Sequence, residues 1–215
     1  WIYDGMDYSV MDPVTERFDR HPERWLHEQG IPGSIERIHI DRHGHYWVKT
    51  YHDGLWVFNK RQGLSRQFTF GNEAQQLDPQ FGVSDIWESG NSLLMISNNG
   101  EIVCLNTHTM RISWKSNKVQ TLSNLRNVFY AIRTDAKKNI WVLTEGRSFV
   151  FVRALGKWVS SAAEALQLMG IEGVPSDMKI WDIATDKHQQ LWLATDHFGL
   201  WVVSSHCLVS TRHFG

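Results

Sequence analysis

A short tryptophan-led string recurs along this 215-residue chain at intervals of about 47 residues, and this period constrains the fold more than any other feature. Each string continues with β-branched or aliphatic residues, as in Trp47-Val-Lys-Thr50. One copy, which starts at Leu94, carries leucine in place of tryptophan. The five copies begin at Trp1, Trp47, Leu94, Trp141 and Trp192.

An acidic residue stands six positions before each internal copy of the string. Because aspartate accepts hydrogen bonds from backbone amides two residues on, we expect each acid to open a hairpin turn. Isoleucine lies three positions before most of these acids, but Ile86 is displaced by one position, which predicts a shorter turn in that unit. The acids are Asp41, Glu88, Asp135 and Asp186.

Each unit holds several apolar runs of strand length separated by Gly, Asn, Asp and Ser, as expected of tight turns. Four strands per unit of this length are typical of propeller blades. We therefore predict an all-β fold, a β-propeller with about five four-stranded blades that form an arc of a larger ring, or else an imperfectly closed ring of five. The predicted blades cover residues 1–34, which lacks its inner strand, and residues 35–82, 83–126, 127–177 and 178–215.

Two connections between blades have helical sequences. Residues Pro22–Gln29 begin with a proline suited to a first helical turn and end before Gly30. Residues Ser161–Met169 are rich in Ala and Leu and end before Gly170. We expect short helices in both, and a third long connection over residues 71–82.

Charge and hydropathy exclude several classes of function. With 22 Lys and Arg against 23 Asp and Glu, the chain has no basic surface for nucleic acid or anionic membranes. No apolar run reaches the roughly 20 residues that span a bilayer. Because the chain starts at Trp1, we expect a single propeller region cut from a longer protein, with membrane contact only through segments outside it.

The unit as a whole resembles the two-component regulator propeller repeat, most closely over Ile38 to Phe58 and Ile180 to Val203. The glycine that this family places before Thr or Ser is replaced here by Lys49, Ile96, Leu143 and Ala194, and one unit has Leu94 in place of its tryptophan. These changes affect packing and leave the fold assignment unchanged. The resemblance implies the periplasmic sensor region of a hybrid two-component histidine kinase, of the kind in gut Bacteroides that responds to glycans. The implied partners are an oligosaccharide or other small ligand, adjacent domains of the same sensor, and a second copy of the chain.

A rival resemblance rests on residues 100–114, which are similar to a quinoprotein-type blade whose last strand ends in Trp114. Two further functions therefore stay open beside a sensor: a non-signalling binding scaffold of quinoprotein-like or lectin type, and a propeller enzyme that acts on polysaccharide.

Catalytic and metal chemistry receive little support from the residues. The acids recur at one turn of every unit, whereas a glycosidase needs two particular carboxylates facing one cleft. His39, His43 and His45 cluster near one hairpin, but other units place different polar residues there. No nucleophile elbow or phosphate loop is present in the sequence. We therefore expect no enzymatic activity, no metal and no cofactor in this chain.

The recurring tryptophans Trp47, Trp141 and Trp192 are expected to form the core between blades. Ligand-binding residues are expected instead on the second turn of each unit, where polar side chains stand beside an aromatic ring that could stack on a sugar. These candidates are Tyr51, His52, Asp53, Asn98, Asn99, Glu145, Arg147, Asp196, His197 and Phe198.

Overall fold

A computed structural model of the chain describes residues 2–3, 8–12, 14–19, 22–51, 54–59, 63–67, 82–203 and 209–211. The chain divides into two compact units, residues 1–81 and 82–215, and each is described by itself. This division coincides with a predicted blade boundary to within one residue.

The first unit contains two antiparallel sheets. The three-stranded sheet is followed by helix α1, Pro22–Glu28, and then by the four-stranded sheet. The strands are β1 Ile2–Tyr3, β2 Tyr8–Met11, β3 Phe18–Asp19, β4 Ile35–Ile40, β5 His45–Thr50, β6 Leu55–Asn59 and β7 Leu64–Gln67.

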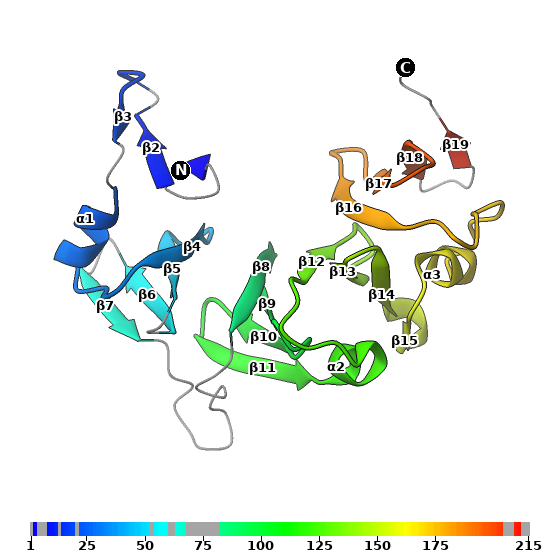
Figure 1. The fold of residues 1–215 in the computed structure, drawn as a ribbon, viewed down its shortest axis with the longest axis horizontal. Helices are drawn as coiled ribbons and strands as arrows, with labels where there is room; N and C mark the ends of the chain where they lie inside the picture. The colour runs from blue at the N-terminus through cyan, green and yellow to red at the C-terminus, as the bar shows by residue number, and fades with distance from the viewer. Residues whose placement is uncertain are drawn as a thin grey trace. The chain divides into compact units, whose positions relative to one another are not determined.

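The second unit contains three four-stranded antiparallel sheets, shown in chain order from green to red in Figure 1. Helix α2, Lys118–Ser123, follows the first sheet, and helix α3, Ala162–Leu168, follows the second. The first two sheets hold β8 Val83–Ser89, β9 Ser92–Ser97, β10 Ile102–Asn106, β11 Arg111–Ser116, β12 Ala131–Thr134, β13 Ile140–Thr144, β14 Arg147–Val152 and β15 Lys157–Val159. The third sheet holds β16 Ile180–Thr185, β17 Leu191–Thr195, β18 Leu200–Val203 and β19 Val209–Thr211.

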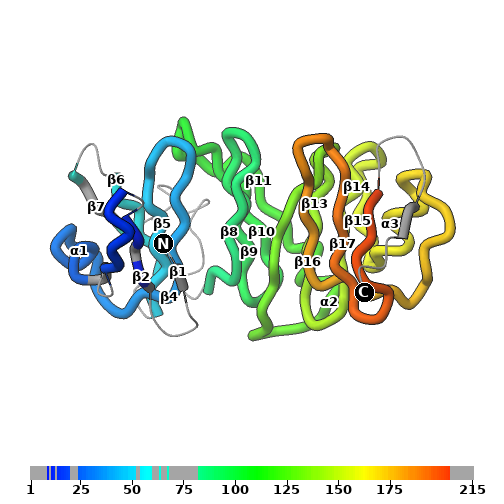
Figure 2. The backbone as a smooth tube through the Cα atoms, turned by 90° about the horizontal axis from the view of Figure 1, so that it is seen from above, coloured from blue at the N-terminus to red at the C-terminus, as the bar shows by residue number. Residues whose placement is uncertain are grey.

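Every sheet is a meander, in which each strand pairs with the next strand along the chain. Within the second unit, β12 contacts both β8 and β16, so the first strands of the three sheets follow one another in space in the same order as in the chain. Figure 2 shows the hairpins of these sheets side by side. The predicted all-β fold of repeated four-stranded units is confirmed.

The recurring acid and the recurring tryptophan are bonded to each other, which explains their constant spacing. In each of three sheets the indole Nε1 donates to the aspartate Oδ2, while Oδ1 accepts backbone amides of the turn. The Nε1 to Oδ2 distances are 3.0 Å for Trp47 and Asp41, 3.1 Å for Trp141 and Asp135, and 3.2 Å for Trp192 and Asp186. The acid therefore holds its turn, as predicted, and also fixes the tryptophan that packs beside it.

These hydrogen bonds predict a loss of stability in acid. Burial opposes ionisation of Asp41, but the bonds from Trp47 and His45 outweigh it and hold the pKa of Asp41 below its usual value. Bonds from Gln190 and Trp192 likewise overcome desolvation and lower the pKa of Asp186. A carboxylate whose pKa falls on folding stabilises the fold above its unfolded pKa of about 4 and loses that contribution as the pH drops further.

We therefore expect the melting temperature to fall as the pH drops below about 4. Melting curves of the wild type and Asp41→Asn between pH 7 and pH 3 check this. The variant should start lower at pH 7 and lose less on acidification, and an equally steep acid decline in the two proteins would contradict the role given to Asp41.

The unit that begins at Leu94 departs from this pattern. Glu88 does not open a turn, contrary to prediction, because it lies within β8 and pairs with Leu93. The hairpin between Ser89 and Ser92 is shorter than its counterparts, as Ile86 predicted. Because position 94 is leucine, this unit has no indole at that position to donate a hydrogen bond, so it needs no aspartate at its turn to accept one.

Both predicted helices are present. Ser161 caps α3, since its hydroxyl accepts the amide of Glu164, and Gly170 follows the helix at a φ of 84°. Helix α2 was not predicted, because its sequence mixes Thr, Val and Ser. Its buried Val119 packs into the apolar cluster that contains Leu94. The predicted connection over residues 71–82 lies outside the described residues except for Gly82. Among the described residues, every helix is too short or too polar to cross a lipid bilayer.

The tryptophans are buried to different extents. Trp47 and Trp141 are fully buried, as predicted, whereas Trp192 is only half-buried. Trp141 belongs to a cluster that joins the second and third sheets of the second unit, with Ile183, Leu193 and Trp201 on the opposite side. It is therefore core between blades in the sense that the sequence predicted.

An arginine links the first strands of all three sheets of the second unit. Arg133 on β12 bonds Asp85 on β8 through Nη1, and its Nε lies 3.2 Å from Oδ1 of Asp182 on β16. Its guanidinium also stacks on the ring of Trp87, 4.9 Å from the centroid. We call this set the Arg133 bridge.

Candidate functional site

Those predicted ligand residues that the structure describes lie in or beside the turns between the second and third strands of their sheets. In the first unit Tyr51 is exposed, while His52 and Asp53 lie outside the described residues. In the second unit the turns place Asn98 and Asn99 before β10, Glu145 and Arg147 before or within β14, and Asp196, His197 and Phe198 before β18. Because the sheets are meanders in register, these turns of the second unit lie at one edge of its blades.

Several of these side chains are used in local structure. The Arg147 guanidinium donates to the carbonyl oxygen of Ser123 and stacks on Phe149. Phe198 packs against the apolar cluster, and Asp196 accepts the backbone amide of His197. Between residues 82 and 203, no hydrogen bond or ion pair joins the predicted side chains of one turn to those of another. The described side chains of different turns therefore make no direct polar contact, and their role in ligand binding stays a prediction.

A cleft of about 680 Å³ lies elsewhere, between the first and second sheets of the second unit. One wall is a row of side chains that pair across β8, β9, β10 and β11. Trp87 pairs with Leu94, Leu94 with Cys104, and Cys104 with Trp114, so these four face the same side of the sheet.

The opposite wall is a second row of paired residues. Thr134 pairs with Ile140, Ile140 with Phe151, and Phe151 with Trp158 across β12 to β15. The rings of Phe151 and Trp158 have centroids 5.5 Å apart. The two walls meet at their inner end, where the Trp87 indole donates to the Thr134 hydroxyl at 3.0 Å.

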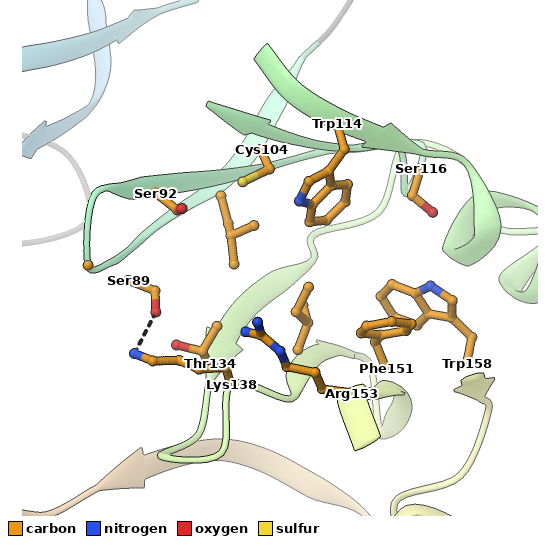
Figure 3. A pocket seen from close by; sticks show the side chains of 13 residues that line it. Ser89, Ser92, Cys104, Trp114, Ser116, Thr134, Lys138, Phe151, Arg153 and Trp158 are labelled. Atoms are coloured by element: carbon orange, nitrogen blue, oxygen red, sulfur yellow. Dashed lines mark hydrogen bonds between the residues drawn. The ribbon is translucent and has the colours of Figure 1, made fainter. Parts of the chain in front are cut away.

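Polar groups line the open sides of the cleft. Ser89 and Lys138 stand at one end, where the ammonium donates to the serine hydroxyl at 3.1 Å, and Figure 3 shows this contact as a dashed line. The Arg153 side chain also lines the cleft and extends from beside Phe151 toward Thr134 and Lys138 (Figure 3). Ser92, Ser116 and Thr134 add hydroxyl groups. Aromatic walls with a few hydroxyl and cationic groups are typical of sites for small ligands.

The cleft exists where the repeat lacks its tryptophan. Leu94 and Trp141 occupy the same position of successive strings, and each points from its own sheet toward the next one. Trp141 fills the space between the second and third sheets, whereas the smaller Leu94 lines the cleft between the first and second. The substitution at position 94 is therefore the sequence signal of this site, and sequence reasoning treated it as a packing change only.

The apolar walls of the cleft carry no negative charge at neutral pH. Burial raises the pKa of the Cys104 thiol, and a hydrogen bond from the Ser92 side chain opposes this only in part. Cys104 therefore stays a neutral thiol, and the ionised groups that line the cleft are Lys138 and Arg153.

The histidines considered for metal binding have other contacts. His45 Nδ1 lies 2.9 Å from Asp41 Oδ2, and the rings of His43 and His45 have centroids 6.1 Å apart. Over the described part of the chain, no group of three or more His, Cys, Asp or Glu side chains is placed to hold a metal ion.

Residues 100–114, which suggested a quinoprotein-type blade, form the hairpin of β10 and β11. The Asn106 side chain accepts the amides of His108 and Thr109, which holds the turn locally. Trp114 at the end of this stretch stands in the cleft wall.

Comparison of the sequence with family models finds no match, and no curated protein matches it. Comparison of the structure does find matches. The chain is similar to the extracellular domain of a protein described as a hybrid two-component system from B. thetaiotaomicron, with 17% identity and a TM-score of 0.57, over 98% of this chain and 26% of that one.

Two other solved structures show a similar fold. The type-IX secretion component PorZ of Porphyromonas gingivalis matches with 12% identity and a TM-score of 0.51, over 83% of this chain and 22% of PorZ. YCF48 from Cyanidioschyzon merolae matches with 10% identity and a TM-score of 0.54, over 89% of this chain and 58% of YCF48.

This chain spans about a quarter of the length of the first two of these proteins. At such low sequence identities, the structural similarity shows a shared fold and nothing beyond the fold. The chain therefore has the β-propeller fold, and the structures it is similar to include the extracellular domain of a hybrid two-component system, in agreement with the resemblance of its repeats.

Proposed function

We propose that this chain is part of the periplasmic ligand-sensing region of a hybrid two-component histidine kinase, and that its ligand is a glycan fragment. The cleft between the first and second sheets of the second unit carries this proposal, because its volume of about 680 Å³ suits a ligand of one to a few sugar rings. The repeat sequence and the fold similarity to an extracellular two-component domain support the same assignment.

The cleft offers what a sugar ring requires. Trp114 on one wall and the Phe151 and Trp158 pair on the other provide flat apolar faces for the CH groups of a pyranose. Serine and threonine hydroxyls along the rim can donate to and accept from sugar hydroxyls. In this proposal the cleft replaces the turn residues as the primary binding site.

Signalling would follow from where the cleft lies. Its walls belong to two different sheets, so a bound ligand contacts both and stabilises one arrangement of the pair. A ligand shifts an equilibrium only by the difference between its affinities for the two states. Binding in the cleft would therefore bias the attached sensor toward the state in which the two walls enclose the ligand.

A binding screen with a matched variant tests the proposal. The full chain is applied to a glycan array, and hits are measured by titration calorimetry against the wild type and Leu94→Trp. The tryptophan restores the residue of the other repeats and fills the cleft, so affinity should fall at least about tenfold, a loss of about 1.4 kcal/mol, while the melting temperature stays at or above that of the wild type. A glycan that binds both proteins equally would rule out the cleft as its site.

A further inference from the structure

Lys138 and Arg153 are cations without a carboxylate partner. Within the stretch from residue 82 to residue 203, no acidic side chain lies within ion-pair distance of either one. Two other cations of the same unit are paired, since Arg133 contacts Asp85 and Asp182, and Lys157 contacts Glu164. Both unpaired cations line the same cleft.

Hydrogen bonds of the backbone fix the points from which these two side chains extend. The amide of Lys138 donates to the carbonyl oxygen of Asp135, and the amide of Arg153 donates to the side chain of Asn139. Their elements belong to one sheet, where Lys138 is in the turn before β13 and Arg153 directly follows β14. Both cations therefore line one partly apolar space, where a bound anion would offset their positive charge.

We propose that the cleft is selective for acidic sugars, that is, a pyranose ring that carries a carboxylate or sulfate group. The ring would stack on the aromatic walls, and its acidic group would contact Lys138 and Arg153. This inference rests on the proposed function, because it names the class of glycan that the cleft binds. Guanidinium and ammonium groups suit carboxylates and sulfates, whereas a neutral sugar would leave both charges without a counterion.

The repeat itself supplies a conservative variant. Lys138 has a φ of 63°, and Gln189 occupies the same turn position in the next sheet with a φ of 63°. Lys138→Gln therefore removes the charge and introduces a residue that this turn already accepts. Lys187→Gln removes one charge from an exposed residue of that other turn and serves as the control.

The experiment measures binding of disaccharides to the full chain by titration calorimetry. The acidic probes are digalacturonate and a sulfated chondroitin disaccharide, the neutral probe is the dimethyl ester of digalacturonate, and benzoate is an anion without a sugar ring. The variants are Lys138→Gln, Arg153→Gln, the double variant and Lys187→Gln.

We expect at least one acidic disaccharide to bind about tenfold or more tightly than the neutral ester. Each cleft variant should reduce that preference by about threefold, the double variant should abolish it, and Lys187→Gln should leave it unchanged. An equal loss in Lys187→Gln would show a general charge effect and overturn the inference.

The remaining outcomes separate this inference from the proposed function. Equal binding of the ester and the acid, with binding still lost in Leu94→Trp, would overturn acid selectivity and leave the glycan sensor intact. Binding of benzoate without either acidic disaccharide would overturn both the acidic-sugar inference and the glycan ligand. Absence of binding by every acidic probe would overturn the inference.

Discussion

Replacement of Arg133 by methionine is expected to lower the free energy of unfolding by about 3 to 5 kcal/mol. The Asp85 side chain is only 6% exposed and the Arg133 side chain 20%, so the variant leaves a buried carboxylate without its cation. The Ile132 amide still donates to Asp85 at 3.0 Å, which places the expected loss toward the lower end of this range. Urea unfolding followed by tryptophan fluorescence measures it.

Two further variants test whether the loss comes from the Arg133 bridge. Asp85→Asn in the Arg133→Met background replaces the buried charge with a neutral amide, so the double variant should be more stable than the sum of the single losses predicts. Lys157→Met breaks the exposed ion pair with Glu164 and should cost at most about 1 kcal/mol. Equal effects of Arg133→Met and Lys157→Met would show that the bridge contributes no more than a surface pair.

Truncation of Trp141 to alanine is expected to cost about 3 to 5 kcal/mol, as for other large buried aromatics. The residue is fully buried, packs between the second and third sheets of the second unit, and donates to Asp135. The variant therefore creates a cavity and also removes one hydrogen bond from a buried carboxylate. Urea unfolding again provides the measurement.

Trp192 is the matched comparison, because it makes the same bond to its own aspartate but is only half-buried. Trp192→Ala should cost clearly less than Trp141→Ala, since less apolar surface leaves water when this side chain packs. From the repeat alone the two would be expected to behave alike. If the two variants lose the same stability, the hydrogen bond to aspartate rather than burial sets the contribution of the repeated tryptophan.

The two repeated positions were predicted well because each serves a local purpose. The aspartate and the tryptophan lie six residues apart in every complete copy, as Asp135 and Trp141 do, because one hairpin brings the carboxylate to the indole. Strand lengths, turn positions and the meander follow from the same local pattern. The sequence could not show that the carboxylate and indole were bonded, because spacing alone does not give side-chain direction.

The sequence could not reveal the cleft, for a physical reason, and the predicted turn residues stay a prediction. Turn residues such as Arg147 and Phe198 looked available in the sequence, but their neighbours in space use them for a carbonyl contact and for core packing. The residues of the cleft are spread from Ser89 to Trp158 and come together only because two sheets face each other. No local pattern joins Trp114 to Phe151, so sequence reasoning had no means to group them.

The amino-acid sequence by itself determined the repeat, the β-strands, the tight turns and the propeller fold, because each depends on contacts within one hairpin or between neighbouring strands. The tertiary structure decided how those units differ. Whether a position between two sheets is filled, as at Trp141, or left open, as at Leu94, depends on the volume that both sheets contribute. That volume, and the position of Lys138 and Arg153 beside it, exist only once the sheets have packed.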